Sequence, residues 1–137
     1  MPDFKINQTR EEIVEVGDAN AIRFLGPEGP RVLSTPHMIG FMERCCRNLV
    51  LDMLDPGDDT VGTHVNVWHK AAAPMGATVA FSAELIAVNY ESGKSPRVEF
   101  RVLARLVDGA AGDKRIGEGT HQRAIINVQA FKGKVTP

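Results

Sequence analysis

Three residues have side chains suited to acid–base or nucleophilic chemistry: Thr35, Glu43 and His69. Glu43 lies at the edge of an apolar helical stripe, where a partly desolvated carboxylate could act as a base, an acid or a nucleophile. His69 alternates with Val65 and Val67 along an expected strand, so it shares their face. Thr35 stands at the start of an expected helix, where free amides can stabilise a developing oxyanion.

Each of these residues also has an ordinary structural explanation. Glu43 could face solvent, His69 could be a hydrogen-bonded core histidine, and Thr35 could simply cap the helix. At about 1.5 Å of rise per residue, Thr35 and Glu43 lie about 12 Å apart along one helix. Their side chains therefore cannot touch within one straight helix. Either a substrate bridges them or one of them comes from a second subunit.

Four further residues are weaker candidates. Cys45 and Cys46 fit helix packing, and neither is a clearly exposed sulfur adjoined by a cation that would stabilise a thiolate. Arg123 and His121 share a strand face with Ile125. An arginine at such a position could bind a phosphate or a carboxylate, or merely cover the edge of a sheet.

One long helix is predicted over residues 36–54. Thr35 is a suitable N-cap and Pro36 suits the first helical position, where its missing N–H is not needed. The Asp-Pro-Gly sequence at residues 55–57 ends the helix. Apolar residues recur at the i, i+3, i+4 spacing of a buried stripe: Met38, Phe41, Met42, Cys45, Leu49 and Met53.

Strands are predicted on either side of this helix. The alternation is clearest over residues 97–107, where every second residue is apolar. Residues 90–96 and 108–114 are typical of hairpin loops. The expected strands cover residues 11–16, 63–70, 77–90, 97–107 and 117–131. One buried helix with long antiparallel strands predicts an α+β fold in which the sheet wraps around the helix.

Length and charge limit the partners. The chain has 137 residues, which fits a single domain over residues 1–137. Its formal net charge of −1 gives no excess of cations to attract nucleic acid or an anionic membrane.

The sequence also bears on where the protein is found. The charge-free run over residues 71–83 has 13 residues, fewer than the ~20 that span a bilayer. The first residues have no apolar core typical of a signal peptide. Two adjacent cysteines suit the reducing cytoplasm.

Several known catalytic and cofactor motifs are missing. The sequence has no GxSxG, P-loop, CxxC or HExxH motif. His64 and His69 are five residues apart on a strand and therefore point to opposite faces. We accordingly expect neither a metal nor a cofactor.

Three segments together resemble the hot-dog-fold thioesterases of the fluoroacetyl-CoA thioesterase type. They are VLSTPHMIGFMERC from Val32, VGTHVNVWHKAAAPMG from Val61 and IGEGTHQRAII from Ile116. The similarity extends to about Phe131. Each segment alone is only moderately specific, but the three occur in order with matching offsets.

The resemblance implies an α+β hot-dog fold, with one long central helix wrapped by an antiparallel sheet. It also implies a homodimer or a dimer of dimers that hydrolyses acyl-CoA to free acid and CoA, with the active site at the subunit interface. Matched motif by motif, the catalytic residues are Thr35, Glu43 and His69. Gly62 matches a glycine whose amide faces the thioester carbonyl, and Arg123 matches an arginine near the acyl-CoA site.

The sequence departs from the family pattern in places. It reads AAAP at residues 71–74 where AATP is common, and GTHQR at residues 119–123 where GTHER is common. The loop at residues 108–114 is longer, and the segment before Val32, which builds the acyl pocket, does not match closely. We therefore expect a small acyl group other than fluoroacetyl, or a general preference for small groups.

Two other functions fit the same fold. An acyl-CoA hydratase could use Asp59 and His64, whose spacing would suit the addition of water. A non-catalytic module could bind acyl-CoA or an acyl carrier protein. Release of free thiol, loss of enoyl absorbance, or binding without turnover would distinguish the three functions.

Overall fold

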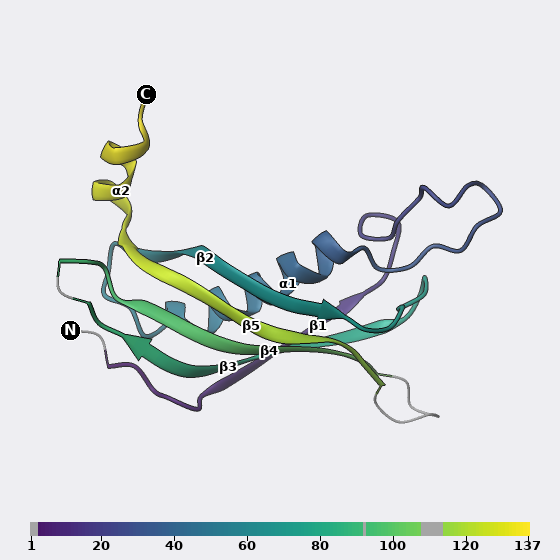
Figure 1. Ribbon diagram of the computed structural model, residues 1–137, viewed down its shortest axis with the longest axis horizontal. Helices are drawn as coiled ribbons and strands as arrows, with labels where there is room; N and C mark the ends of the chain where they lie inside the picture. Colours follow the sequence, from purple (N-terminus) through teal and green to yellow (C-terminus); the bar gives the residue numbers. More distant parts are fainter. Residues whose placement is uncertain (1–2, 92, 108–113) are drawn as a thin grey trace.

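The computed structural model describes residues 3–91, 93–107 and 114–137 (Figure 1). The predicted loop at residues 108–114 therefore lies, except for its last residue, outside the described residues. The elements follow the order β1 (Thr9–Glu15), α1 (Thr35–Leu51), β2 (Asp58–His69), β3 (Thr78–Asn89), β4 (Arg97–Leu106), β5 (Lys114–Asn127) and α2 (Val128–Val135). This order confirms the predicted α+β arrangement.

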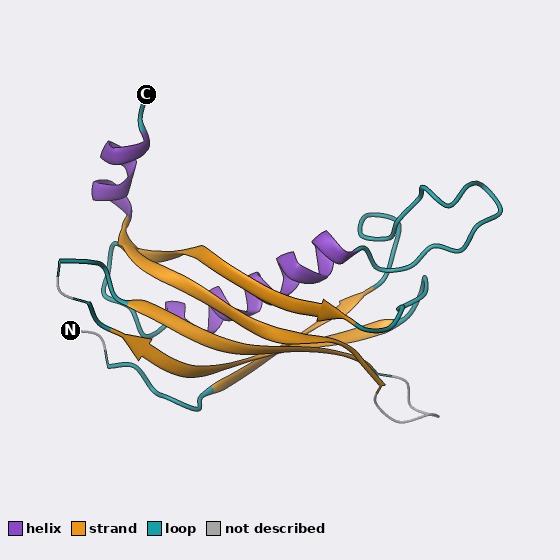
Figure 2. Ribbon diagram, viewed as in Figure 1, coloured by secondary structure: helices purple, strands orange, loops and turns teal. Residues whose placement is uncertain are grey.

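The five strands form one antiparallel sheet in the order β1-β3-β4-β5-β2. The sheet curves, and α1 lies along one of its faces (Figure 2). The short helix α2 and the segment before α1 project from the body (Figure 1). Strands β1 and β2 are the two edges of the sheet, and each pairs with one neighbour among the described strands.

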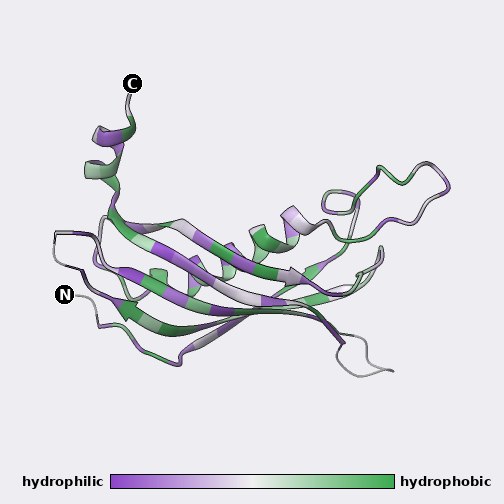
Figure 3. Ribbon diagram, viewed as in Figure 1, coloured by the Kyte–Doolittle hydropathy of each residue, from purple (hydrophilic) through white to green (hydrophobic). Residues whose placement is uncertain are grey.

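Alternating side chains bury one face of the sheet against α1. In β4 the predicted inward residues Val98, Phe100, Val102 and Ala104 are all buried, as the alternation required. Figure 3 shows the corresponding change between hydrophobic and hydrophilic positions along the strands. The core is therefore the space between α1 and this face.

The ends of α1 differ from the prediction. Ser34, not Thr35, is the N-cap, because the Ser34 side chain accepts a hydrogen bond from the His37 amide. Thr35 is the first helical residue, so its hydroxyl is free for another partner. The helix ends at Leu51 and not at residue 54, because the next amides bond to carbonyls three residues back and form turns.

Two of the predicted strands differ from the structure by four or more residues at one end. Strand β2 begins at Asp58, five residues before the predicted start. Strand β5 ends at Asn127, because the Asn127 side chain accepts a hydrogen bond from the Ala130 amide and caps α2. Residues 128–131 were predicted as strand and are helical. Their apolar character favoured a strand, but the N-cap at Asn127 stabilises a helix there.

Both cysteines are buried in α1 and are expected to be inert to thiol reagents. Burial raises the pKa of Cys45 to about 12 and raises that of Cys46 further, so almost no thiolate forms near neutral pH. A disulfide reagent such as DTNB should leave both thiols unlabelled in the native protein over an hour and label both in denaturant. Rapid native labelling of either thiol would contradict this packing.

Candidate functional site

The start of α1 and the end of β2 bring Thr35 and His69 together. Thr35 Oγ1 lies 2.8 Å from His69 Nδ1, within hydrogen-bond distance. The Leu33 amide donates to the Ala73 carbonyl at 2.8 Å, which ties the chain before α1 to the chain after β2. Thr35 is exposed and His69 is half-buried. A hydroxyl paired with an imidazole at a surface can bind and move a proton.

Glu43 belongs to a second group, in the middle of α1. Its Oε2 accepts a hydrogen bond from Arg123 Nη1 at 3.2 Å and lies 3.7 Å from His121 Nε2. The Glu43 side chain is 38% exposed, whereas Arg123 is only 6% exposed. The Glu43 carboxylate is therefore paired with a buried cation, while its exposed part remains accessible to an incoming molecule.

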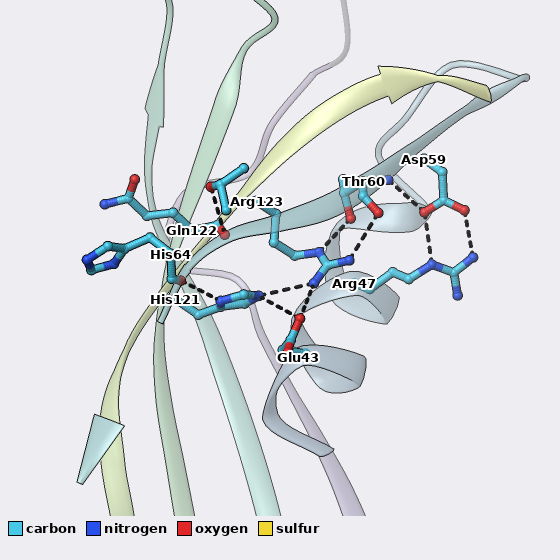
Figure 4. Close-up of polar contacts among 9 residues, drawn as sticks. Glu43, Arg47, Asp59, Thr60, His64, His121, Gln122 and Arg123 are labelled. Carbon is cyan, nitrogen blue, oxygen red and sulfur yellow. Dashed lines mark hydrogen bonds and ion pairs between the residues drawn. The ribbon is translucent and has the colours of Figure 1, made fainter. Parts of the chain in front are cut away.

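Arg123 is held from several directions (Figure 4). Its Nε donates to Thr60 Oγ1 at 2.7 Å and its Nη2 donates to the Thr60 carbonyl at 3.0 Å. Its Nη1 lies 3.1 Å from His121 Nε2. Burial lowers the pKa of Arg123, and the charge of Glu43 opposes that change. An arginine remains charged under such conditions, so this side chain presents a fixed positive charge to Glu43.

Gly62 lets the β2 backbone approach the Glu43 carboxylate. A Cβ at Gly62 would lie 2.7 Å from Glu43 Oε2 and 3.3 Å from His121 Cε1. The pairing between β2 and β5 also shifts in register between Gly62 and His64. Any larger residue at position 62 would therefore push the carboxylate from its place.

The predicted site residues form two groups that are separate within the described chain. Thr35 meets His69, while Glu43 meets Gly62 and Arg123; no hydrogen bond among the described residues joins the two groups. Gly62 and His69 are seven positions apart, about 23 Å along β2. One chain thus presents two separate groups, one near the middle of β2 and one at its end.

Two members of the second group were not predicted as catalytic or substrate-binding residues. His121 was only a weaker candidate, noted with Arg123 on one strand face, and Thr60 was not considered. The period-2 pattern of β5 puts His121 and Arg123 on the same face as Ile125, and all three are buried. Buried polar groups need hydrogen-bond partners, so this pattern could have indicated that His121 and Arg123 interact with each other. Nothing in the sequence indicated Thr60.

The residues of the hydratase alternative do not meet. Both Asp59 carboxylate oxygens accept hydrogen bonds from Arg47, at 2.9 and 2.6 Å, and Oδ1 also accepts from the Thr60 amide. The His64 side chain is exposed and points away from Asp59 (Figure 4). Asp59 therefore has a structural role in this chain.

The described residues offer neither a metal-binding cluster nor a membrane-spanning helix. They contain no cluster of three or more His, Cys, Asp or Glu side chains arranged to hold a metal ion. No helix in that part of the chain has the length and hydropathy needed to cross a bilayer.

Comparison with known proteins gives a consistent result. The sequence model of the FlK family, described as fluoroacetyl-CoA-specific thioesterase, matches residues 16–129. The fluoroacetyl-CoA thioesterase of Streptantibioticus cattleyicolor is 38% identical over 120 residues, covering 83% of this chain and 79% of that protein. A solved structure of the fluoroacetyl-CoA thioesterase FlK is 35% identical, with a TM-score of 0.80 and coverage of 98% and 99% of the two chains.

More distant structures agree on the fold. A hot-dog-like protein from Thermanaerovibrio acidaminovorans has a TM-score of 0.80 at 18% identity, covering 96% of this chain and 90% of that chain. The hot-dog fold expected from the sequence is therefore confirmed. The chain belongs to the FlK family of fluoroacetyl-CoA-specific thioesterases.

Proposed function

We propose that the protein hydrolyses the thioester of a small acyl-CoA, in an active site formed between two copies of the chain. The observation that carries this proposal is the pair of half-sites along β2, one near its middle and one at its end. One half-site holds Thr35 and His69, and the other holds Glu43 beside Gly62 and Arg123. Neither half-site alone offers both an imidazole and a carboxylate to a substrate.

Antiparallel pairing of two β2 strands would complete the site. Strand β2 is an edge strand, and its residues 62–66 and Trp68 are exposed. The opposite edge, β1, carries charged residues at positions 10–12, which disfavour strand addition. A two-fold axis near residues 65–66 would place the Gly62 end of one strand beside the His69 end of the other. Each dimer would then contain two composite sites.

The chemistry follows from the groups thus assembled. The Gly62 amide would donate to the thioester carbonyl oxygen as negative charge develops there. Water adds to the carbonyl carbon and loses its proton to Glu43 or His69. Alternatively, the Glu43 carboxylate attacks that carbon itself and forms an acyl-enzyme anhydride as CoA leaves, and water then cleaves the anhydride to release the acid and restore Glu43. In both routes the carbon–sulfur bond breaks, and the CoA thiolate takes up a proton. The Thr35 hydroxyl, which lies within hydrogen-bond distance of His69, would be a further polar group in contact with the substrate.

The acyl group is small but need not be fluoroacetyl. We expect the segment before Val32 to set this preference, although the family model matches from residue 16 onward and three of the solved relatives contain fluoroacetate or acetyl-CoA. We place the protein in the cytoplasm because its two cysteines are unpaired.

A turnover screen tests the proposed function. Acetyl-, fluoroacetyl-, butyryl- and octanoyl-CoA would be incubated with the protein, and free thiol would be detected with DTNB. Because both protein thiols are buried, the signal should come from CoA. Release of thiol from the short substrates is expected. Loss of enoyl absorbance without thiol release would indicate a hydratase, and saturable binding without turnover would indicate a binding module; either would overturn the proposal.

The substitution Gly62→Ala should impair hydrolysis without unfolding the protein. The added Cβ would lie 2.7 Å from Glu43 Oε2 and force the carboxylate to move. A shift of about 1 Å in a reacting group can lower the rate about 100-fold. Steady-state kinetics should show the loss in kcat. Gly40→Ala is a matched control, because a Cβ there meets no atom within 4 Å; equal activity of the two variants would contradict the role of Gly62.

A further inference from the structure

His121 has hydrogen-bond partners that define where its proton lies. Its Nδ1 is 2.8 Å from the His64 carbonyl oxygen, which can only accept a hydrogen bond. Its Nε2 is 3.1 Å from Arg123 Nη1, which can only donate. The proton therefore lies on Nδ1, and Nε2 presents a lone pair to Arg123. This is the neutral imidazole.

The surroundings of His121 also favour the neutral form. The residue is 2% exposed, and the Phe100 ring of β4 stacks on it at 6.4 Å. Burial lowers the pKa of His121, and the Arg123 charge lowers it further. The hydrogen bond to the His64 carbonyl and the Glu43 charge oppose these effects without reversing them. The titratable groups facing it are Arg123 on β5, Glu43 on α1 and His64 on β2.

We propose that His121 is a positioning residue for hydrolysis: its neutral imidazole accepts a hydrogen bond from Arg123 Nη1 and so aims that nitrogen at Glu43 Oε2. The proposal rests on the proposed role of Glu43. Thr60 holds the Nε and Nη2 side of the guanidinium, and His121 holds the Nη1 side. Glu43 is thus the only partner of the guanidinium, among the described residues, that substrate can also reach.

Removing the acceptor would disturb this arrangement. Without His121 Nε2, one N–H of Arg123 Nη1 would be buried and unpaired, an unfavourable state that rotation of the guanidinium would relieve. That rotation would move the hydrogen bond donated to Glu43 Oε2 and hence the carboxylate. The carboxylate would still be present, so substrate binding should be little affected.

A matched pair of substitutions separates the two ring nitrogens of His121. In His121→Asn the amide N–H can replace Nδ1 and bond to the His64 carbonyl, but nothing replaces Nε2. In His121→Gln the amide oxygen can replace Nε2 as the acceptor for Arg123. We expect His121→Asn to lower kcat roughly 10- to 100-fold with KM changed less than about threefold, and His121→Gln to recover most of kcat. Equal losses in the two variants would overturn the proposal.

A measurement on the unmodified protein keeps the proposal testable if the variants fail to fold. Two-bond ¹⁵N–¹H correlation spectra report which nitrogen of each histidine carries a proton. For His121 we expect the neutral form protonated on Nδ1, persisting at pH 6. A proton on Nε2, or an imidazolium at that pH, would overturn the proposal.

The two experiments also separate failure of this proposal from failure of the proposed function. If no acyl-CoA is hydrolysed, the proposed function fails, while the spectra still decide the state of His121. If the wild-type protein hydrolyses acyl-CoA but the two variants lose kcat equally, His121 has only a packing role and the proposed function stands.

Discussion

Replacing Glu43 by glutamine is expected to lower kcat for thioester hydrolysis by roughly 1,000-fold, within the range for loss of a general base or nucleophile. Glutamine keeps the shape of the side chain and an oxygen that can accept from Arg123 Nη1. It cannot accept a proton from water or attack a thioester as a carboxylate. Because substrate contacts remain, KM should change little. Steady-state kinetics on the best acyl-CoA from the turnover screen measure both constants.

Glu91→Gln is the matched control for this substitution. The Glu91 side chain is 68% exposed and contacts Lys94 on the surface, so its loss should leave kcat at the wild-type value. Turnover of Glu43→Gln within about threefold of wild type would exclude Glu43 from the reaction, since even a modest general-base contribution is about 100-fold. The proposed hydrolysis would then lack the carboxylate that serves as its base or nucleophile.

Replacing His69 by alanine is expected to lower kcat by roughly 100-fold or more. The substitution removes the imidazole that holds Thr35 Oγ1 at 2.8 Å and that can exchange a proton with it. The side chain is only half-buried, so the free energy of unfolding should fall by no more than about 1 kcal/mol. Kinetics and a thermal unfolding curve of the same sample separate the two effects.

His64→Ala controls for the loss of a histidine from the same strand. The His64 side chain is exposed, and His64 contacts His121 through its backbone carbonyl, which alanine retains. His64 also lies on the edge of β2 that the proposed dimer pairs, so size-exclusion chromatography must first show that His64→Ala is still a dimer; its hydrolysis should then match the wild type. If His64→Ala loses activity and His69→Ala does not, the catalytic histidine has been wrongly assigned.

Local patterns in the sequence were enough to predict the main elements. The i, i+3, i+4 stripe identified α1, and the period-2 alternation of residues 97–107 identified β4 and its buried face. The ends of elements were less predictable, because they depend on single side-chain hydrogen bonds. Ser34 is the N-cap of α1, where Thr35 was expected. Asn127 is the N-cap of α2, in an apolar segment that was predicted to continue the preceding strand.

The candidate site could be proposed from the sequence as a set of residues but not as an arrangement. The family motifs pointed to Thr35, Glu43 and His69, and the helix rise indicated that the side chains of Thr35 and Glu43 cannot touch within one straight helix. Arg123 was expected near the acyl-CoA site; in the structure it lies against Glu43 with its other nitrogens on Thr60 and His121. Those contacts join α1, β2 and β5, so they depend on the register of strands distant in sequence.

Complementation between two inactive variants tests most directly whether the active site is shared between subunits. Glu43→Gln and His69→Ala chains with different affinity tags would be co-expressed, and dimers carrying both tags would be purified. In the proposed dimer one composite site contains both substitutions and the other contains neither, so the heterodimer should show about half of the wild-type kcat per dimer. A heterodimer no more active than its two parents would show that Glu43 and His69 act within one chain and would contradict the shared site.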